Sequence, residues 1–132
     1  MVFEGGKNMV ESISNKMSNA EKLVRDYLTE FGIYWLYEHP VTIKDEKNLQ
    51  RTYYPDFYLP TFGLYVEVCG ADREEYKRRQ DIYFKNNIPV IFVHTFKDEK
   101  DWKKHLIKNI VDKTLEKSEL LQNLLVKNLF KL

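Results

Sequence analysis

The sequence predicts an α/β domain in which helices flank a mixed central sheet, in the order helix, three strands, helix, strand. Apolar residues recur at helical spacing in segments 18–32 and 72–87. Segments 33–43 and 51–70 are instead rich in aromatic and β-branched residues, which is typical of strands. The apolar run at 88–94 suits a buried strand. We therefore expect an antiparallel meander of three strands, followed by a helix and a further strand.

The first helix is predicted to begin after Ser18 and to end at Gly32. Ser18 is a typical N-cap residue, and Glu21, three residues later, completes a capping box. Apolar residues then follow on one helix face, at Leu23, Val24, Tyr27, Leu28 and Phe31. The capping box is a sufficient structural explanation for Glu21, so any functional role for this acid needs separate support.

Composition limits the size of the protein and its partners. The 132 residues are 43% hydrophobic, enough for one domain with a core of ordinary size. The formal net charge of +1 gives no general attraction to nucleic acid, so such a partner would need a local basic patch. A single cysteine, Cys69, excludes an internal disulfide. No segment has the pattern of a signal peptide or a membrane span, and we expect a cytoplasmic protein with no membrane partner.

Two acidic residues stand out because they occur in aromatic, strand-like sequence. Asp56 lies in an extended aromatic segment, and Glu67 lies among the β-formers of 64–68. With 60–63 as a turn, both are expected on adjacent strands of one hairpin. Neighbouring buried carboxylates repel each other and lose hydration, and a divalent cation offsets both costs. The sequence thus favours a hard-metal site, although two acids that face solvent would give the same pattern.

The segments that contain these acids resemble a known nuclease motif. Tyr-Pro-Asp-Phe-Tyr-Leu-Pro at 54–60 and Tyr-Val-Glu-Val-Cys-Gly at 65–70, with ten residues between the two acids, resemble the two halves of the PD-(D/E)xK superfamily motif. The chain is similar to the nuclease modules of some helicases and of very-short-patch repair-type endonucleases, where a helix with a Glu precedes a Tyr-Glu strand, as Glu21 precedes 37–38 here. The resemblance spans about 18–95 and implies a restriction-endonuclease-like αβββαβ core.

The resemblance also implies a reaction and a set of site residues. In that family the expected activity is metal-dependent endonucleolytic hydrolysis of phosphodiester bonds, here with DNA favoured over RNA, in repair, recombination or restriction. Asp56, Glu67 and the Val68 carbonyl would hold Mg²⁺ or Mn²⁺, and Glu21 would add a ligand directly or through water. A second class stays open, a catalytically silent domain of the same fold that binds nucleic acid or a protein partner.

One departure from the family pattern concerns its lysine, which should stand two residues after Glu67. This chain has Cys69 there, so the cation would have to come from elsewhere. Superfamily members sometimes carry it on the following helix. Arg79 lies nearest to the Tyr76 and Tyr83 face that should pack on the sheet, and we expect Arg79 to be the substitute.

Several polar residues receive less specific predictions. Gln80 would orient a water or a ligand, or would simply be a polar residue at the margin of the packed helix. Four cationic side chains are candidate contacts for nucleic-acid phosphates, with a solvated helix face as the alternative for those on the helix: Arg51, Arg73, Lys77 and Arg78. The histidines lack metal-cluster spacing and are expected to be structural: His39, His94 and His105.

The end of the chain is predicted to be helical from about 98 to 131, with a break near Lys117 and Ser118. Its leucine-rich part carries more apolar surface than a small domain needs, which favours a homodimer through this region. The alternative is a tail that folds back over the same chain. We divide the chain into a flexible arm at 1–17, a nuclease-like domain at 18–112 and a helical extension at 113–132.

Overall fold

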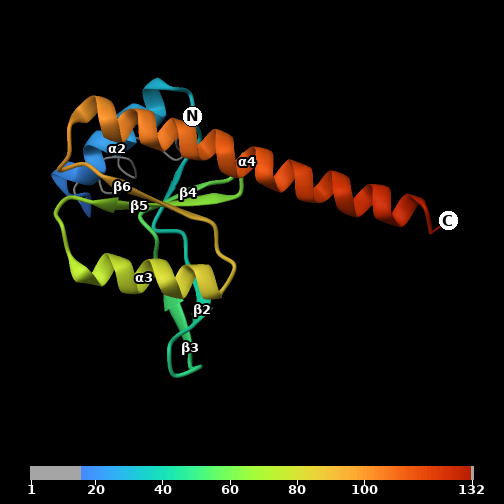
Figure 1. Cartoon of the computed structure of the whole chain (residues 1–132). Helices are drawn as coiled ribbons and strands as arrows, with labels where there is room; N and C mark the ends of the chain where they lie inside the picture. Colours follow the sequence, from blue (N-terminus) through green and yellow to red (C-terminus); the bar gives the residue numbers. More distant parts are fainter. Residues whose placement is uncertain (1–15, 132) are drawn as a thin grey trace, which may run out of the picture.

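The structure is a computed structural model that describes residues 16–131, and it is α/β as predicted, with a mixed sheet between helices (Figure 1). Its elements in chain order are α2 (Asn19–Glu30), β1 (Leu36–Tyr37), β2 (Val41–Lys44), β3 (Gln50–Tyr53), β4 (Phe57–Leu59), β5 (Leu64–Cys69), α3 (Glu74–Lys85), β6 (Val90–His94) and α4 (Glu99–Leu129).

The main sheet has four strands in the order β1-β4-β5-β6. β4 runs antiparallel to both β1 and β5, while β6 is parallel to β5. The helices α2 and α4 cover one face of this sheet, and α3 covers the other (Figure 1). The parallel pairing follows from the chain path, because α3 is the crossover between β5 and β6. The predicted final strand is therefore confirmed.

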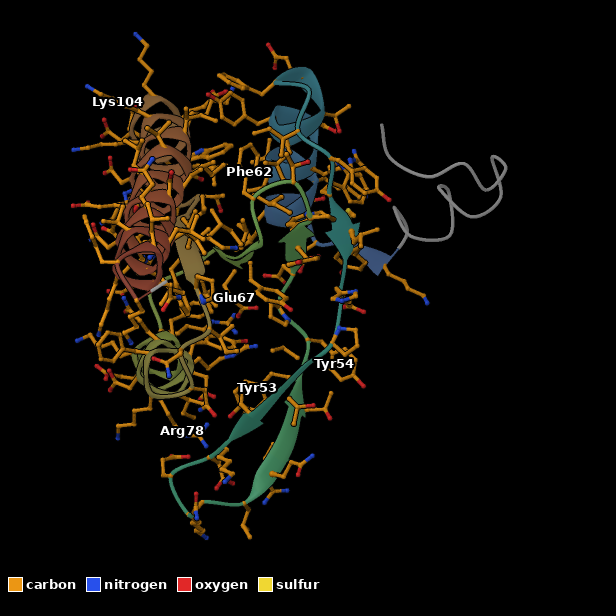
Figure 2. All side chains as sticks on the ribbon, turned by 90° about the vertical axis from the view of Figure 1, so that its right-hand side faces the viewer. Tyr53, Tyr54, Phe62, Glu67, Arg78 and Lys104 are labelled. Atoms are coloured by element: carbon orange, nitrogen blue, oxygen red, sulfur yellow. The ribbon has the colours of Figure 1, made fainter. Side chains whose placement is uncertain are left out.

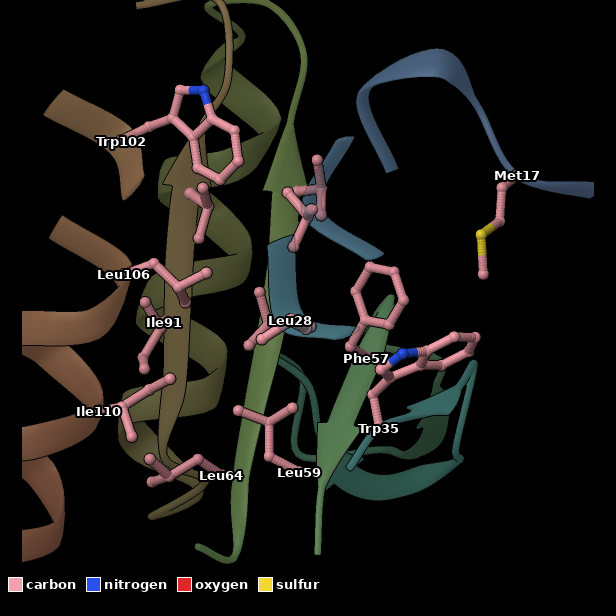
Figure 3. Packing of buried hydrophobic residues seen from close by; sticks show 14 residues of the cluster. Met17, Leu28, Trp35, Phe57, Leu59, Leu64, Ile91, Trp102, Leu106 and Ile110 are labelled. Atoms are coloured by element: carbon pink, nitrogen blue, oxygen red, sulfur yellow. The ribbon is translucent and has the colours of Figure 1, made fainter. Parts of the chain in front are cut away.

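The larger core lies between α2, α4 and one face of the sheet (Figure 3). Side chains of β5 alternate, so that Val66 and Val68 face this core. Glu67 and Cys69 consequently face the opposite side. There Cys69 packs with Ile82 of α3 in a second, smaller cluster. The alternation places the predicted acid on the α3 side of the sheet.

The expected single strand at 33–43 is wrong, because the chain forms two short strands there that belong to different sheets. β1 pairs with β4, whereas β2 pairs with β3 in a separate two-stranded hairpin. The break falls at Glu38, whose φ of 53° is left-handed, and at Pro40, which has no amide hydrogen for a ladder. The Asp56 segment is divided as well, into β3 and β4. The meander β1-β4-β5 is thus present with a hairpin inserted into it.

The start of the described chain confirms the predicted cap. The Ser18 side chain accepts a hydrogen bond from the Glu21 amide, the Glu21 carboxylate accepts one from the Ser18 amide, and Gly32 follows the helix with a φ of 78°. Of the predicted arm at 1–17, residues 1–15 lie outside the described part of the chain. Met17 is buried in the larger core, so the packed domain begins before Ser18.

The last helix is continuous, and the predicted break near Lys117 and Ser118 is wrong. No Gly or Pro interrupts 99–129, and Ser118 is exposed, so nothing forces the backbone out of the helix. Only the first half covers the sheet, through Trp102, Leu106 and Ile110. The second half projects away from the body (Figure 1), which contradicts a tail folded back on its own chain. Within 16–131 no helix has the length and apolarity needed to cross a bilayer.

Candidate functional site

The two predicted acids lie opposite each other, Glu67 on β5 and Asp56 just before β4. Phe57 is opposite Val66, so Asp56 just before β4 meets Glu67 of β5. The Asp56 amide donates a hydrogen bond to Glu67 Oε1 at 3.1 Å, and the Val68 amide donates one to Asp56 Oδ2 at 2.7 Å. Each carboxylate is therefore held by the backbone of the other strand. We call Asp56 and Glu67 the carboxylate pair.

Burial makes the carboxylate pair electrostatically costly. Glu67 is only 1% exposed, and Figure 2 shows it in the interior, above α3 and the β2–β3 hairpin. Burial raises the pKa of Glu67 to about 7, although the Arg79 charge opposes that rise. Asp56 is part-buried, and burial together with the negative charge of Glu67 raises its pKa to about 8. A positive charge at this position would relieve the cost.

Arg79 of α3 supplies such a charge. Its Nη1 lies 2.9 Å from Glu67 Oε2, and its Nη2 donates a hydrogen bond to the Tyr83 hydroxyl at 3.2 Å. The guanidinium also lies over the Tyr53 ring, 5.5 Å from the ring centroid. The expected position of Arg79 beside the acids is therefore found. Arginine suits this place because its fork can bind a carboxylate and stack on an aromatic ring together.

Cys69 occupies the position of the family lysine on the same face of β5 as Glu67. Its side chain is fully buried beside Tyr83 and Phe92 in the smaller cluster. Burial, with the charges of the carboxylate pair, raises the pKa of this thiol to about 12. Cys69 is therefore a neutral thiol that behaves as a small apolar residue.

Glu21 lies near the carboxylate pair but is engaged elsewhere. Its carboxylate accepts hydrogen bonds from the Ser18 amide at 3.3 Å and from the Tyr37 hydroxyl at 2.7 Å. Its negative charge still contributes to the raised pKa of Asp56 and of Glu67. In the part of the chain that the structure describes, no three His, Cys, Asp or Glu side chains are arranged to hold a metal ion. Both hydrogen bonds to Glu21 end on the same oxygen, Oε2.

Gln80 and the candidate phosphate contacts are not gathered at the pair. Gln80 is exposed and lines a groove of about 520 Å³ between α3 and α4, because the buried face of α3 is centred on Ile82 and Tyr83. Arg51 pairs with Asp45, and Arg78 pairs with Glu46 and Glu75. Arg73, the N-cap residue of α3, and Lys77 within that helix are both exposed.

Three tyrosines of the site were not predicted as functional residues: Tyr37, Tyr53 and Tyr83. Tyr83 follows Arg79 by four positions on α3, so helical spacing could have indicated this contact. Tyr37 and Tyr53 reach the site only through the divided strands, and no local pattern marks them. Among the histidines, His39 stacks on Tyr58, while His94 and His105 line a separate cavity of about 300 Å³.

Comparison with known proteins does not extend this picture. No protein-family model matches the chain, and searches of curated proteins and of solved structures find no significant match. The functional argument therefore rests on the geometry and electrostatics of the carboxylate pair and Arg79.

Proposed function

We propose that this chain is a metal-dependent endonuclease with a restriction-endonuclease-like core, which hydrolyses phosphodiester bonds and acts on DNA in preference to RNA. The observation that carries the proposal is the carboxylate pair, in which each acid is hydrogen-bonded to the backbone of the opposite segment and Arg79 lies 2.9 Å from Glu67. The stability of the fold does not require this arrangement, because apolar residues at the two positions would avoid both the desolvation of the carboxylates and their mutual repulsion.

The donor set of the pair suits a hard divalent cation. Mg²⁺ and Mn²⁺ favour oxygen ligands, and Mg²⁺ is commonly bound by one or two carboxylates together with waters and substrate phosphates. Asp56 and Glu67 would hold the ion, with the Val68 carbonyl as a further oxygen. Glu21 would add a ligand directly or through water, since its bonds to Ser18 and Tyr37 both use Oε2. When bound, such an ion activates a water and polarises the phosphoryl oxygen.

Arg79 takes the role of the absent lysine in this proposal. Its guanidinium remains protonated at any working pH, so it can stabilise negative charge on a phosphate but cannot remove a proton. In the absence of substrate it balances part of the Glu67 charge. Its hydrogen bond to Tyr83 and its position over Tyr53 hold the guanidinium at the acids, which limits the reorganisation needed when a substrate arrives.

A catalytically silent domain of the same fold is the second candidate, and one observation favours it. The ion pair between Arg79 and Glu67 already offsets part of the buried charge, so the pair can persist without a metal. On this view the surface would bind nucleic acid or a protein partner through the exposed Arg73 and Lys77. The two candidates differ in whether a bound nucleic acid is cut.

Incubation with labelled nucleic acids distinguishes the candidates. Duplex, branched and single-stranded DNA and the equivalent RNAs are incubated with Mg²⁺, Mn²⁺ or a chelator, and binding and cleavage are both measured. We expect metal-dependent cleavage that Glu67→Gln abolishes, while Glu74→Gln, an exposed change on α3, serves as a matched control and leaves it intact. Binding without cleavage under every condition would refute the enzyme and support the silent domain.

A further inference from the structure

The second half of α4 is an apolar helix surface that the rest of the described chain leaves uncovered. We call residues 118–131 the α4 tail. Its apolar side chains are each more than half exposed: Leu120, Leu121, Leu124, Leu125, Val126, Leu129 and Phe130. The helical part of the tail, through Leu129, extends for about 18 Å at 1.5 Å per residue. A run of exposed leucines of this length is typical of an interaction surface.

Leucines of the α4 tail lie on the same face of the helix as the residues of its first half that pack on the sheet. Leu124 follows Leu106 by 18 residues, about five helical turns, and Leu121 follows Ile110 by 11 residues, about three turns. Leu106 and Ile110 are buried against the sheet, whereas Leu121 and Leu124 lie beyond its end. The helix thus presents apolar side chains on one face in both halves, which we call the stripe, with Lys113, Thr114 and Lys117 between them. Only the first half of the stripe is packed on the sheet.

Helix physics makes an unpartnered tail unfavourable. Isolated helical segments of this length are marginal in water, and their stability in proteins comes mainly from the packing of an apolar face. The tail has no Gly or Pro and continues the helix without interruption. The helix therefore extends beyond the edge of the sheet instead of ending there. A partner that covers the stripe would account for both features.

Charges along the tail point to the identity of that partner. Glu116, just before the tail, lies along one edge of the Leu121 and Leu124 face, and Lys127 and Lys131 lie along the same edge at the tip. Lys117 reaches back to the turn at Gly63. Two copies of this helix in antiparallel alignment would bring Glu116 of each beside the basic tip of the other. A parallel pair would instead place like charges together.

We propose that the α4 tail forms an antiparallel helix pair with the α4 tail of a second copy, giving a two-fold symmetric dimer. Leu121, Leu124 and Leu125 form the centre of the contact, and the Glu116 and Lys131 positions flank it. Two-fold symmetry fits because one self-complementary patch is used twice. This inference does not depend on the proposed nuclease activity, since the tail lies outside the carboxylate pair.

Sedimentation equilibrium on the full chain tests the dimer. The wild type is expected to have twice the chain mass of 15.9 kDa at micromolar concentration. Leu121→Glu and Leu125→Glu should each weaken association at least tenfold while the circular dichroism of the core is retained, because both positions are exposed in the single chain. Asn123→Glu, an exposed change on the polar side of the same helix, is the control and should remain dimeric. A monomeric wild type, or variants with unchanged mass, would overturn the proposal.

Cross-linking tests the orientation of the helices. Cys69 is buried, so new surface cysteines can be read without interference. Chains carrying Glu116→Cys are mixed with chains carrying Lys131→Cys and oxidised. The antiparallel pair predicts a disulfide between the two different chains. Disulfides only between identical chains would show the parallel arrangement and overturn the proposed one.

Discussion

Replacing Asp56 with asparagine tests whether the carboxylate pair is held at a cost to the fold. Asparagine keeps an oxygen that can accept the Val68 amide hydrogen bond but removes the negative charge beside Glu67. The pKa of Asp56 rises from 3.8 to about 8 in the folded chain. Because each pKa unit corresponds to about 1.4 kcal/mol, the ionised carboxylate could cost up to roughly 6 kcal/mol of unfolding free energy. Asp56 is only part-buried and its strands can relax, so we expect a gain of about 1–3 kcal/mol.

The pH dependence of the unfolding free energy follows from the direction in which folding shifts the Asp56 pKa. A carboxyl group whose pKa is raised by folding holds its proton more tightly in the folded chain than in the unfolded chain. The wild type should therefore lose stability as the pH rises from about 4 through the folded pKa of about 8. Asp56→Asn should match the wild type below pH 4 and exceed it increasingly up to about pH 9.

Thermal unfolding in chelator measures the effect. At pH 8 to 9 the midpoint for Asp56→Asn should lie roughly 3–10 °C above that of the wild type, in line with the size of the domain. Asp112→Asn, an exposed change on α4, is the matched control and should shift it by less than about 2 °C. A lower midpoint for Asp56→Asn at pH 8 would refute the reasoning, because Asp56 would then be a structural hydrogen-bond acceptor whose charge is needed.

Two further predictions concern the cation at the site. Arg79→Ala should lower the rate of nucleic-acid cleavage by roughly two orders of magnitude or more, the scale for losing one charge contact in a transition state, while metal binding measured by calorimetry persists. Lys85→Ala, an exposed change on α3, is the control, and equal losses in the two variants would contradict the assignment. Adding Cys69→Lys to Arg79→Ala should restore part of the activity, because position 69 faces the same side of β5 as Glu67. In the wild-type background Cys69→Lys should lower the unfolding temperature, since it buries an ammonium among apolar side chains. No recovery in the folded double variant would count against a shared position for the two cations.

Local sequence signals predicted those parts of the site that depend on local geometry. The capping box at Ser18, the alternation that puts Glu67 and Cys69 on one face, and the helical spacing that aims Arg79 at the sheet all need only neighbouring residues. The buried face of α3 was predicted less well, because the expected face was set by Tyr76 and Tyr83, whereas Ile82 is buried and Gln80 is exposed.

Features that depend on distant residues were missed. The division of segment 33–43 depends on the left-handed backbone at Glu38, a residue type that gives no warning of it. The contact of Tyr53 with Arg79 depends in turn on where that division sends the β2–β3 hairpin. The continuous α4 was missed for another reason, since a polar Lys-Ser step suggested a break that an exposed helix surface tolerates.

The mutual hydrogen bonds of the carboxylate pair also fix the register in which β4 and β5 pair. Asp56 and Glu67 each bind the amide of the opposite strand, so both bonds form only when Phe57 lies opposite Val66. A slip by one residue would turn Glu67 into the apolar core, and a slip by two would leave both buried carboxylates without these amide donors. The acids proposed for chemistry thereby select one strand alignment during folding. Two apolar residues in their place would be expected to raise stability while removing this discrimination between alignments.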